Sequence, residues 1–345
     1  MGLNAPPRVR LGSIPTPCEP ASDLGALLKI DQLWVKRDDL LGHSWGGNKV
    51  RPIEFLLGDA LHQRADAVVM CGGPTSNFAA LMAAACAQYG LQVHQVCYGH
   101  RPDRLPAAMA VGTRSGTVFH FTGSSDRLSM EPAAQALAER LRSLGSTPYL
   151  LPRGGATAVG SLGYAQAAGE LVDQLTQSGL SSATVVVPVG SGGTIAGLIA
   201  GWTYALDSGA PPFEVDLVGV SVSRAPEDLQ AEIAAIARAA AEHRGHDGTR
   251  GASASCRWRL VDGRGIGFGA SDATERALID RIELRTRFLV DPTYNGKALR
   301  WLRDSAAHLG GPVVYWHTGG VLGVVDRICN QGGASASRLT ETTCQ

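Results

Sequence analysis

The chain has 345 residues, of which 44% are hydrophobic and 18% charged, and these values predict about two packed domains. Its 31 basic and 31 acidic residues cancel, and no basic stripe interleaved with aromatic residues suggests a nucleic-acid partner. No apolar run reaches the roughly 18 residues of a membrane span, and the N-terminus lacks the pattern of a secretory signal. We therefore expect a cytoplasmic protein with no membrane or nucleic-acid partner.

The cysteines indicate neither a disulfide framework nor a zinc site. The 7 cysteines are scattered, odd in number and without a CxxC pair. Cys71 and Cys86 lie in apolar runs, where a free cysteine packs as a small hydrophobe. We therefore expect no metal in the protein.

Strands and helices are predicted to alternate along the whole chain. In its first half we expect a Pro-rich arm over residues 1–22, strand 33–37, helix 50–64, strand 67–71, helix 77–89, strand 93–97, helix 104–115, strand 117–121 and helix 130–144, which the segment 148–152 follows. In its second half we expect helix 160–178, strand 183–189, helix 194–207, strand 215–222, helix 227–243, a flexible insertion over 244–259, helices 272–287 and 297–309, strand 313–317 and a disordered tail over 331–345.

This alternation predicts an α/β fold with mostly parallel sheets. Ligands of such folds bind at the carboxyl ends of the strands. Glycine-rich segments follow predicted strands at 72–77, 190–194 and 318–320, and a further segment, 46–51, precedes a helix. These segments can therefore converge on one site.

Lys49 follows Gly46-Gly47-Asn48 and opens the predicted helix 50–64. Glycines let the backbone turn tightly and approach a ligand closely. A helix start favours anions over cations, so a lysine there suits an anionic ligand or a Schiff base with an aldehyde cofactor. For the segment taken alone, an ordinary loop with a solvated lysine is the alternative.

The run Gly190-Ser191-Gly192-Gly193-Thr194 joins a buried strand to a helix. Backbone N–H groups at such a helix start bind anions, and the Ser191 and Thr194 hydroxyls add donors. No Gly-Lys-Ser/Thr follows, so the run is not a P-loop. The next strand carries no acid at its end, over 219–223, so phosphate fits better than NAD. A plain strand–helix turn is the alternative.

The chain resembles the 1-aminocyclopropane-1-carboxylate deaminase and D-cysteine desulfhydrase family, within the tryptophan synthase β-like (fold type II) enzymes that use pyridoxal 5′-phosphate (PLP). The resemblance runs from about Pro15 to Gly323. Its carriers are Lys36-Arg37-Asp38-Asp39, Gly46–Lys49, Gly72-Gly73 with Ser76-Asn77, Gly190–Thr194, Asp291–Ala298 and His317–Gly320. The resemblance implies a homodimer and a two-domain, three-layer fold, with residues 1–51 and 159–330 in a large PLP-binding domain and 52–158 in a small one.

The resemblance also implies a role for each motif residue. Lys49 would hold PLP as a Schiff base, and Asn77 would hydrogen-bond the cofactor's 3′ oxygen. Ser76 would bind the substrate carboxylate or assist proton transfer, and Tyr294 would lie over the active site as acid/base or stacking ring. The phosphate would be cradled by Gly190, Ser191, Gly192, Gly193 and Thr194. Without the family, Ser76 and Asn77 are more often a helix cap, and Tyr294 a half-buried packing residue.

The chain departs from the family pattern at two positions. Asn295 stands where the deaminases carry a glutamate, which partners the pyridine nitrogen of PLP. An amide there would make the ring a weaker electron sink than a carboxylate does. Phe268 stands where the family carries a tyrosine, so a substrate-side phenol is missing. Thr318, expected at the cofactor, resembles the desulfhydrases instead.

The motifs together predict a PLP-dependent lyase for a small amino acid. It would remove the α-proton through Lys49 and expel a β-substituent such as a thiol, giving a keto acid and ammonia. One alternative is a β-replacement or specialised biosynthetic enzyme, in which a nucleophile captures the aminoacrylate. A second is a non-catalytic ligand-binding relative, against which the intact Lys49 argues.

Overall fold

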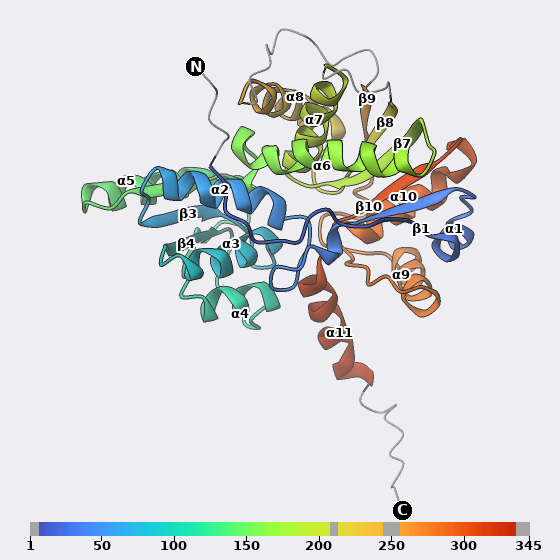
Figure 1. Cartoon of the computed structure of the whole chain (residues 1–345). Coiled ribbons are helices and arrows are strands. Elements are labelled where there is room, and N and C mark those ends of the chain that lie inside the picture. Colours follow the sequence, from blue (N-terminus) through green and yellow to red (C-terminus); the bar gives the residue numbers. More distant parts are fainter. Residues whose placement is uncertain (1–6, 208–212, 244–255, 336–345) are drawn as a thin grey trace, which may run out of the picture.

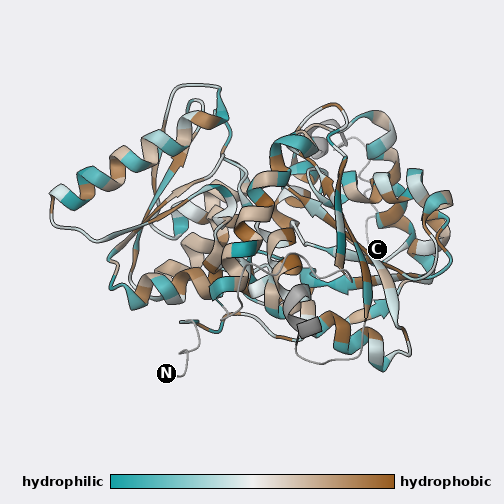
Figure 2. Ribbon diagram, turned by 90° about the horizontal axis from the view of Figure 1, so that it is seen from above, coloured by the Kyte–Doolittle hydropathy of each residue, from teal (hydrophilic) through white to brown (hydrophobic). Residues whose placement is uncertain are grey.

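The computed structural model describes residues 7–207, 213–243 and 256–335. Two sheets lie side by side in it, as Figure 1 shows and as the view from above in Figure 2 repeats. The larger sheet has the strand order β1-β2-β10-β7-β8-β9 and the smaller one the order β5-β4-β3-β6. All neighbouring strands are parallel except β1 and β2 at one edge. The prediction of an α/β fold with mostly parallel sheets is confirmed.

The strands of the larger sheet come from both ends of the chain. They are β1 (Cys18–Pro20), β2 (Leu33–Arg37), β7 (Ser182–Val189), β8 (Glu214–Ser221), β9 (Cys256–Asp262) and β10 (Val313–His317). One face packs on α6 (Ala158–Gln177), α7 (Gly193–Asp207) and α8 (Pro226–His243). The other face packs on α1 (Ser22–Leu28), α9 (Ala273–Arg285) and α10 (Asn295–Ser305). Helices therefore cover both faces, and the central strands β7 and β10 read as nearly continuous apolar runs, as buried parallel strands do.

The smaller sheet comes from one continuous part of the chain. Its strands are β3 (Ala67–Cys71), β4 (Gln92–Cys97), β5 (Val118–Phe121) and β6 (Pro148–Leu151). Helices α2 (Val50–His62) and α3 (Asn77–Gln88) pack on one face, and α5 (Met130–Ser143) packs on the other. Helix α4 (Ala107–Arg114) packs between α3 and α11 (Val321–Ser335). Short 3₁₀ turns complete the elements, namely η1 (Asp38–Leu40), η2 (Arg127–Ser129), η3 (Arg153–Gly155) and η4 (Ala306–His308). None of the described helices is long and apolar enough to span a bilayer.

The structure corrects some of the predicted boundaries. Strand β9 begins at Cys256, inside the predicted flexible insertion, and residues 244–255 lie outside the described part. Helix α11 runs on to Ser335, inside the predicted disordered tail, and residues 336–345 also lie outside it. The predicted N-terminal arm contains β1 and leads into α1 at Ser22.

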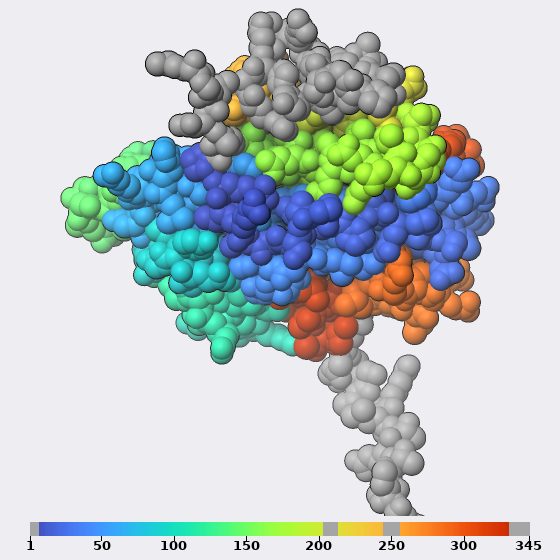
Figure 3. Space-filling view, in the orientation of Figure 1, coloured from blue at the N-terminus to red at the C-terminus, as the bar shows by residue number. Residues whose placement is uncertain are grey.

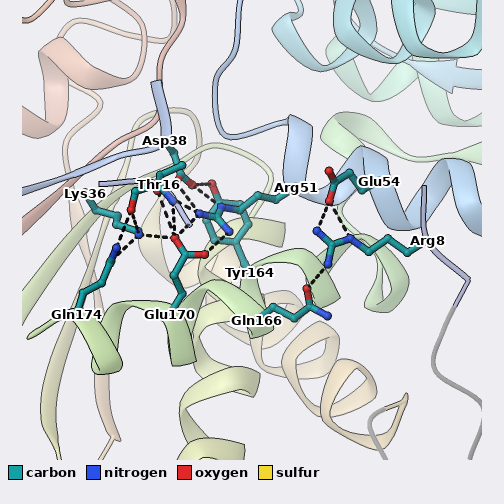
Figure 4. A network of polar contacts seen from close by, with 10 residues as sticks. All are labelled: Arg8, Thr16, Lys36, Asp38, Arg51, Glu54, Tyr164, Gln166, Glu170 and Gln174. Atoms are coloured by element: carbon teal, nitrogen blue, oxygen red, sulfur yellow. Dashed lines mark hydrogen bonds and ion pairs between the residues drawn. The ribbon is translucent and has the colours of Figure 1, made fainter. Parts of the chain in front are cut away.

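A buried ionic network ties the start of α2 to the rest of the fold (Figure 4). The Arg51 guanidinium donates to the Asp38 carboxylate at 2.9 Å through Nε and Nη2, and to Glu170 of α6 at 3.0 Å. We call the set the Arg51 network; it consists of Thr16, Lys36, Asp38, Arg51, Tyr164, Glu170 and Gln174. Two bases face two acids, so the network is electrically balanced where it is buried.

The described start of the N-terminal arm, dark blue in Figure 3, runs over the surface of α2 and α6. The Arg8 guanidinium pairs with Glu54 of α2 and donates to Gln166 of α6 at 2.7 Å. Backbone N–H groups of Leu11 and Gly12 donate to the same Glu54 carboxylate at 2.8 and 2.9 Å. The arm therefore fastens α2 to α6 from outside, beside the Arg51 network.

Candidate active site

A cavity of about 400 Å³ lies where the carboxyl ends of β3, β7 and β10 meet. It is lined by Asn48 and Lys49, by residues of 72–78, by the whole of 190–194 and by 318–320. The segments that the sequence analysis expected to converge therefore do so. Further lining comes from the loop before α5, from η3 and from the loops before α9 and α10.

Lys49 caps the start of α2 and lines the cavity. Burial lowers the pKa of its ammonium to about 8, and no charged group of the described residues offsets this effect. The chain's other lysines differ, because Lys36 is held in an ion pair, Lys297 donates to two carbonyl oxygens, and Lys29 is exposed. Lys49 is thus the lysine that most readily supplies a neutral, nucleophilic amine.

Glycines allow the Lys49 loop to approach the 318–320 loop closely. Gly46 and Gly47 have φ values of +69° and +99°, a region that favours glycine. A Cβ atom on Gly47 would stand 3.2 Å from the carbonyl oxygen of Thr318, which also accepts from the Asn48 N–H at 3.0 Å. Any side chain at position 47 would therefore push Lys49 away from β10.

The run 190–194 connects β7 to the first turn of α7, whose N–H groups have no partners within the helix. Gly192 has a φ of +92°, and a Cβ there would stand 2.6 Å from the Ile233 side chain. The Thr194 hydroxyl accepts from the Asn48 amide at 3.2 Å, which ties the run to the Lys49 loop. A helix start, the hydroxyls of Ser191 and Thr194 and a narrow glycine turn together fit a phosphate group.

Ser76 caps α3, Asn77 is its first residue, and both line the cavity. The Ser76 hydroxyl accepts from the Ala79 N–H at 3.2 Å, so the helix-cap interpretation of this residue is confirmed. The Asn77 Oδ1 atom is buried and has no hydrogen-bond partner among the described residues. A buried amide left unpaired is costly unless a ligand satisfies it. Asn77 therefore fits a polar group of a bound molecule, and Ser76 presents a helix start to an anion.

Tyr294 and Phe268 lie together at the cavity. Their ring centroids are 5.9 Å apart at an interplanar angle of 80°, an edge-to-face contact. Burial, with the Asp291 carboxylate nearby, raises the pKa of the Tyr294 phenol to about 12. The phenol therefore stays protonated near neutral pH and can donate a proton.

Asn295 does not line the cavity, which differs from the expectation that its amide faces a pyridine nitrogen. The residue is fully buried, and its Oδ1 accepts from the Tyr315 hydroxyl and from the Thr318 N–H at 3.2 Å. Its Nδ2 donates to Asp291 and to the Gly319 carbonyl at 2.7 Å. Both ends of the amide are committed, so Asn295 supports the wall behind the cavity.

Thr318 and Asp291 occupy the wall in front of Asn295. The Thr318 hydroxyl lies 3.2 Å from Asn295 Oδ1, and the residue lines the cavity, as expected for a group at the cofactor. The Asp291 carboxylate accepts from the N–H groups of Thr293 and Tyr294 at 3.0 and 2.8 Å. Burial raises the pKa of Asp291, against these hydrogen bonds. Asp291 opens the Asp291–Ala298 run, which by itself predicts no role for this carboxylate.

Arg127 and Tyr98 also line the cavity, although no sequence motif predicts them there. Arg127 belongs to η2, in a polar loop whose composition is that of any solvent-exposed turn. Tyr98 follows β4, and the Gly73 backbone runs so close to its ring that a Cβ on Gly73 would stand 2.7 Å from Tyr98 Cε1. The only available signal was their position after strands that end at the cavity.

The residues present fit an aldehyde cofactor that carries a phosphate. A reactive amine, a phosphate seat and an unpaired buried amide line one cavity, and these are the groups that PLP needs. The fold and the site thus define a PLP enzyme with mostly parallel sheets.

Comparison with known proteins agrees with this class. Residues 9–319 match the family model described as pyridoxal-phosphate dependent enzyme. A Pyrococcus furiosus protein provisionally named 1-aminocyclopropane-1-carboxylate deaminase is 32% identical over 92% of this chain and 93% of its own length. A D-cysteine desulfhydrase of Salmonella schwarzengrund is 32% identical over 91% and 94%.

A solved structure gives the same result. The crystal structure of a 1-aminocyclopropane-1-carboxylate deaminase homologue superposes with a TM-score of 0.82 at 32% identity, over 96% of each chain. The chain therefore belongs to the 1-aminocyclopropane-1-carboxylate deaminase and D-cysteine desulfhydrase family of PLP-dependent enzymes. Its cofactor is PLP and its fold is that of the fold type II enzymes.

Proposed function

We propose that the protein is a PLP-dependent lyase that removes the α-proton of a small amino acid and expels a β-substituent. One observation carries the proposal. Lys49, whose pKa is lowered by burial, lines the same cavity as the phosphate seat of residues 190–194. Relatives named for D-cysteine desulfhydrase activity perform chemistry of this kind. Bound PLP supplies the electron sink that stabilises negative charge on the substrate's α-carbon.

The chain's own residues divide the remaining work. The start of α3, with Ser76 at its cap, binds the substrate carboxylate through the helix dipole and N–H groups. Lys49 accepts the α-proton at Nζ, since its lowered pKa leaves part of the amine neutral near pH 7. The Tyr294 phenol, protonated at that pH, donates a proton to the departing group.

The proposal extends to the arrangement of the chain. Residues 52–158 contain every strand of the smaller sheet and form the small domain, whereas 1–51 and 159–330 form the large one. The protein acts as a homodimer in the cytoplasm. The dimer rests on the family resemblance, and the location rests on the sequence pattern.

The test is the site of cofactor attachment. The purified protein should be yellow, and borohydride reduction followed by peptide mapping should place the cofactor on Lys49. Lys49→Arg should lose the visible absorbance and all turnover of cysteine, whereas the matched variant Lys29→Arg, at an exposed lysine, should keep both. A label on another lysine, or protein without bound PLP, would refute the assignment.

A further inference from the structure

Arg127 lines the cavity without a partner for its charge. The Nε atom is buried and has no hydrogen-bond partner among the described residues. Its guanidinium carbon lies 4.2 Å from the centroid of the Phe268 ring and 6.0 Å from that of Tyr98. Stacking on aromatic faces holds a guanidinium in place and leaves its N–H edges free to bind an anion.

The other arginines that line the cavity are paired. Arg153 bonds Glu131, Arg224 bonds Glu232 at 2.8 Å, and Arg327 bonds Glu283 at 2.6 Å. Each of these pairs is neutral as a unit, although one oxygen of Glu131 is left without a partner. Within the part of the chain that the structure describes, Arg127 is therefore the guanidinium of the cavity that lacks a carboxylate.

The rings around Arg127 place it near the proposed carboxylate site. Tyr98 packs on Gly73, in the segment that leads to Ser76, and Phe268 packs on Tyr294. The phosphate seat, in contrast, is beside Arg224, because the adjacent Ser223 hydroxyl donates to the Gly190 carbonyl at 3.1 Å. Since the α3 start already receives the α-carboxylate, Arg127 is left for a second anionic group.

We infer that Arg127 binds an anionic β-substituent. The substrates are then amino acids whose β-carbon carries a second anionic group, such as a phosphate ester. The inference rests on the proposed function and names its substrate class. The Cα–H proton passes to Lys49, and the Cβ–X bond breaks with its electron pair going to X. A proton from the substrate's ammonium group is relocated to Cβ, and one water then supplies the carbonyl oxygen, which leaves the keto acid, ammonium and the X anion, with the Cα proton on Lys49. Arg127 neutralises the charge on X as it departs.

The first test measures binding without turnover. Succinate and butyrate have the same carbon chain length, but only succinate carries a second carboxylate. By calorimetry on the PLP-loaded enzyme, succinate should bind more tightly than butyrate. Arg127→Gln should weaken succinate on the order of 10- to 100-fold, the loss expected for a charge-assisted hydrogen bond, and leave butyrate unchanged. Arg114→Gln, at an exposed arginine outside the cavity lining, is the matched control.

A second variant separates binding from a mechanical role. If Arg127 only holds Phe268 in place, Arg127→Gln and Phe268→Leu will weaken both ligands equally, and the inference is wrong. If Arg127 binds the second charge, Phe268→Leu will keep the preference for succinate. Equal binding of the two ligands by the wild-type enzyme would also overturn the inference.

Turnover separates this inference from the proposed function. The ratio of kcat/KM for O-phosphoserine to that for 3-chloroalanine should fall in Arg127→Gln, while elimination from 3-chloroalanine persists. Elimination from 3-chloroalanine with no response of O-phosphoserine to Arg127→Gln would refute the anionic substrate class alone. Absence of PLP from Lys49 would refute the proposed function.

Discussion

Phe268 places an aromatic ring at the cavity, but it lacks the hydroxyl of the tyrosine that the family carries at this position. The ring packs edge-to-face on Tyr294 and under the Arg127 guanidinium, so its position is fixed from both sides. Without a hydroxyl it cannot transfer a proton, and Tyr294 is the phenol left next to it. Substrates that bring their own leaving group need such a proton less than a cyclopropane ring does.

We therefore predict negligible deamination of 1-aminocyclopropane-1-carboxylate by the wild-type enzyme. Phe268→Tyr should raise this activity, because a general acid or base contributes about 10²–10⁴-fold, while turnover of D- and L-cysteine changes little. The measurement is the rate on the three substrates side by side. Fast ring opening by the wild type would contradict the role assigned to the missing hydroxyl.

At the scale of single residues, sequence analysis found the groups that sit in recognisable runs. Lys49, Asn77 and the 190–194 run all line the cavity. The sequence did not predict Arg127, because an arginine in a polar loop carries no local signal. Its place at the cavity follows from its contacts with aromatic rings distant in the sequence. The role of Asn295 at the pyridine nitrogen stays a prediction. In the structure Tyr294 lines the cavity, whereas Asn295 lies behind the lining with both ends of its amide bonded.

Helix α2 carries Lys49 at its start and depends on the Arg51 network for its position. Burial opposes ionisation of Asp38 and Glu170, but Arg51 outweighs it and holds the pKa of both carboxyls below their usual range. The unfolded chain then binds protons at a higher pH than the folded one. The ionised Asp38 and Glu170 carboxylates therefore stabilise the folded state fully above the ordinary carboxyl pKa values, near 4. This contribution to the free energy of unfolding is lost as the pH falls below those values.

We predict that Arg51→Met destabilises the protein by roughly 3–5 kcal/mol, because it leaves buried carboxylates without their partner. The variant should also lose less of its remaining stability than the wild type when the pH falls from 6 to about 3. Denaturant unfolding at several pH values measures both effects. Arg114→Gln serves as the control, and a parallel acid dependence of Arg51→Met and wild type would contradict this role of the network.

The elements that the sequence did not predict all have weak local signals for a helix or a strand. Strand β9 alternates buried and exposed residues at a sheet edge and carries Arg257 and Arg259, so it lacks the apolar run of a central strand. Helix α1 has 7 residues, and β1 has 3. Helix α11 is rich in glycine. Tertiary contacts, more than local propensity, stabilise each of these elements.

The whole molecule places its cavity between two sheets, so lining residues come from segments far apart in the chain. We predict that the protein is a homodimer, as the family resemblance implies. Light scattering across a wide range of protein concentration should give twice the mass of the 36.1 kDa chain. A mass of one chain throughout that range would count against the dimer.

The position of β10 has a consequence for how the protein is made. This strand, Val313–His317, is among the last elements in the chain, yet it lies between β2 and β7 in the larger sheet. Until the ribosome has released it, β2 and β7 cannot join through it, and each presents an unpaired strand edge, which is a template for aggregation. The phosphate seat after β7 and the Lys49 loop after β2 are brought together by the same strand. Assembly of the PLP site therefore requires synthesis of β10, and a nascent chain that stops before Val313 has neither the joined sheet nor the site.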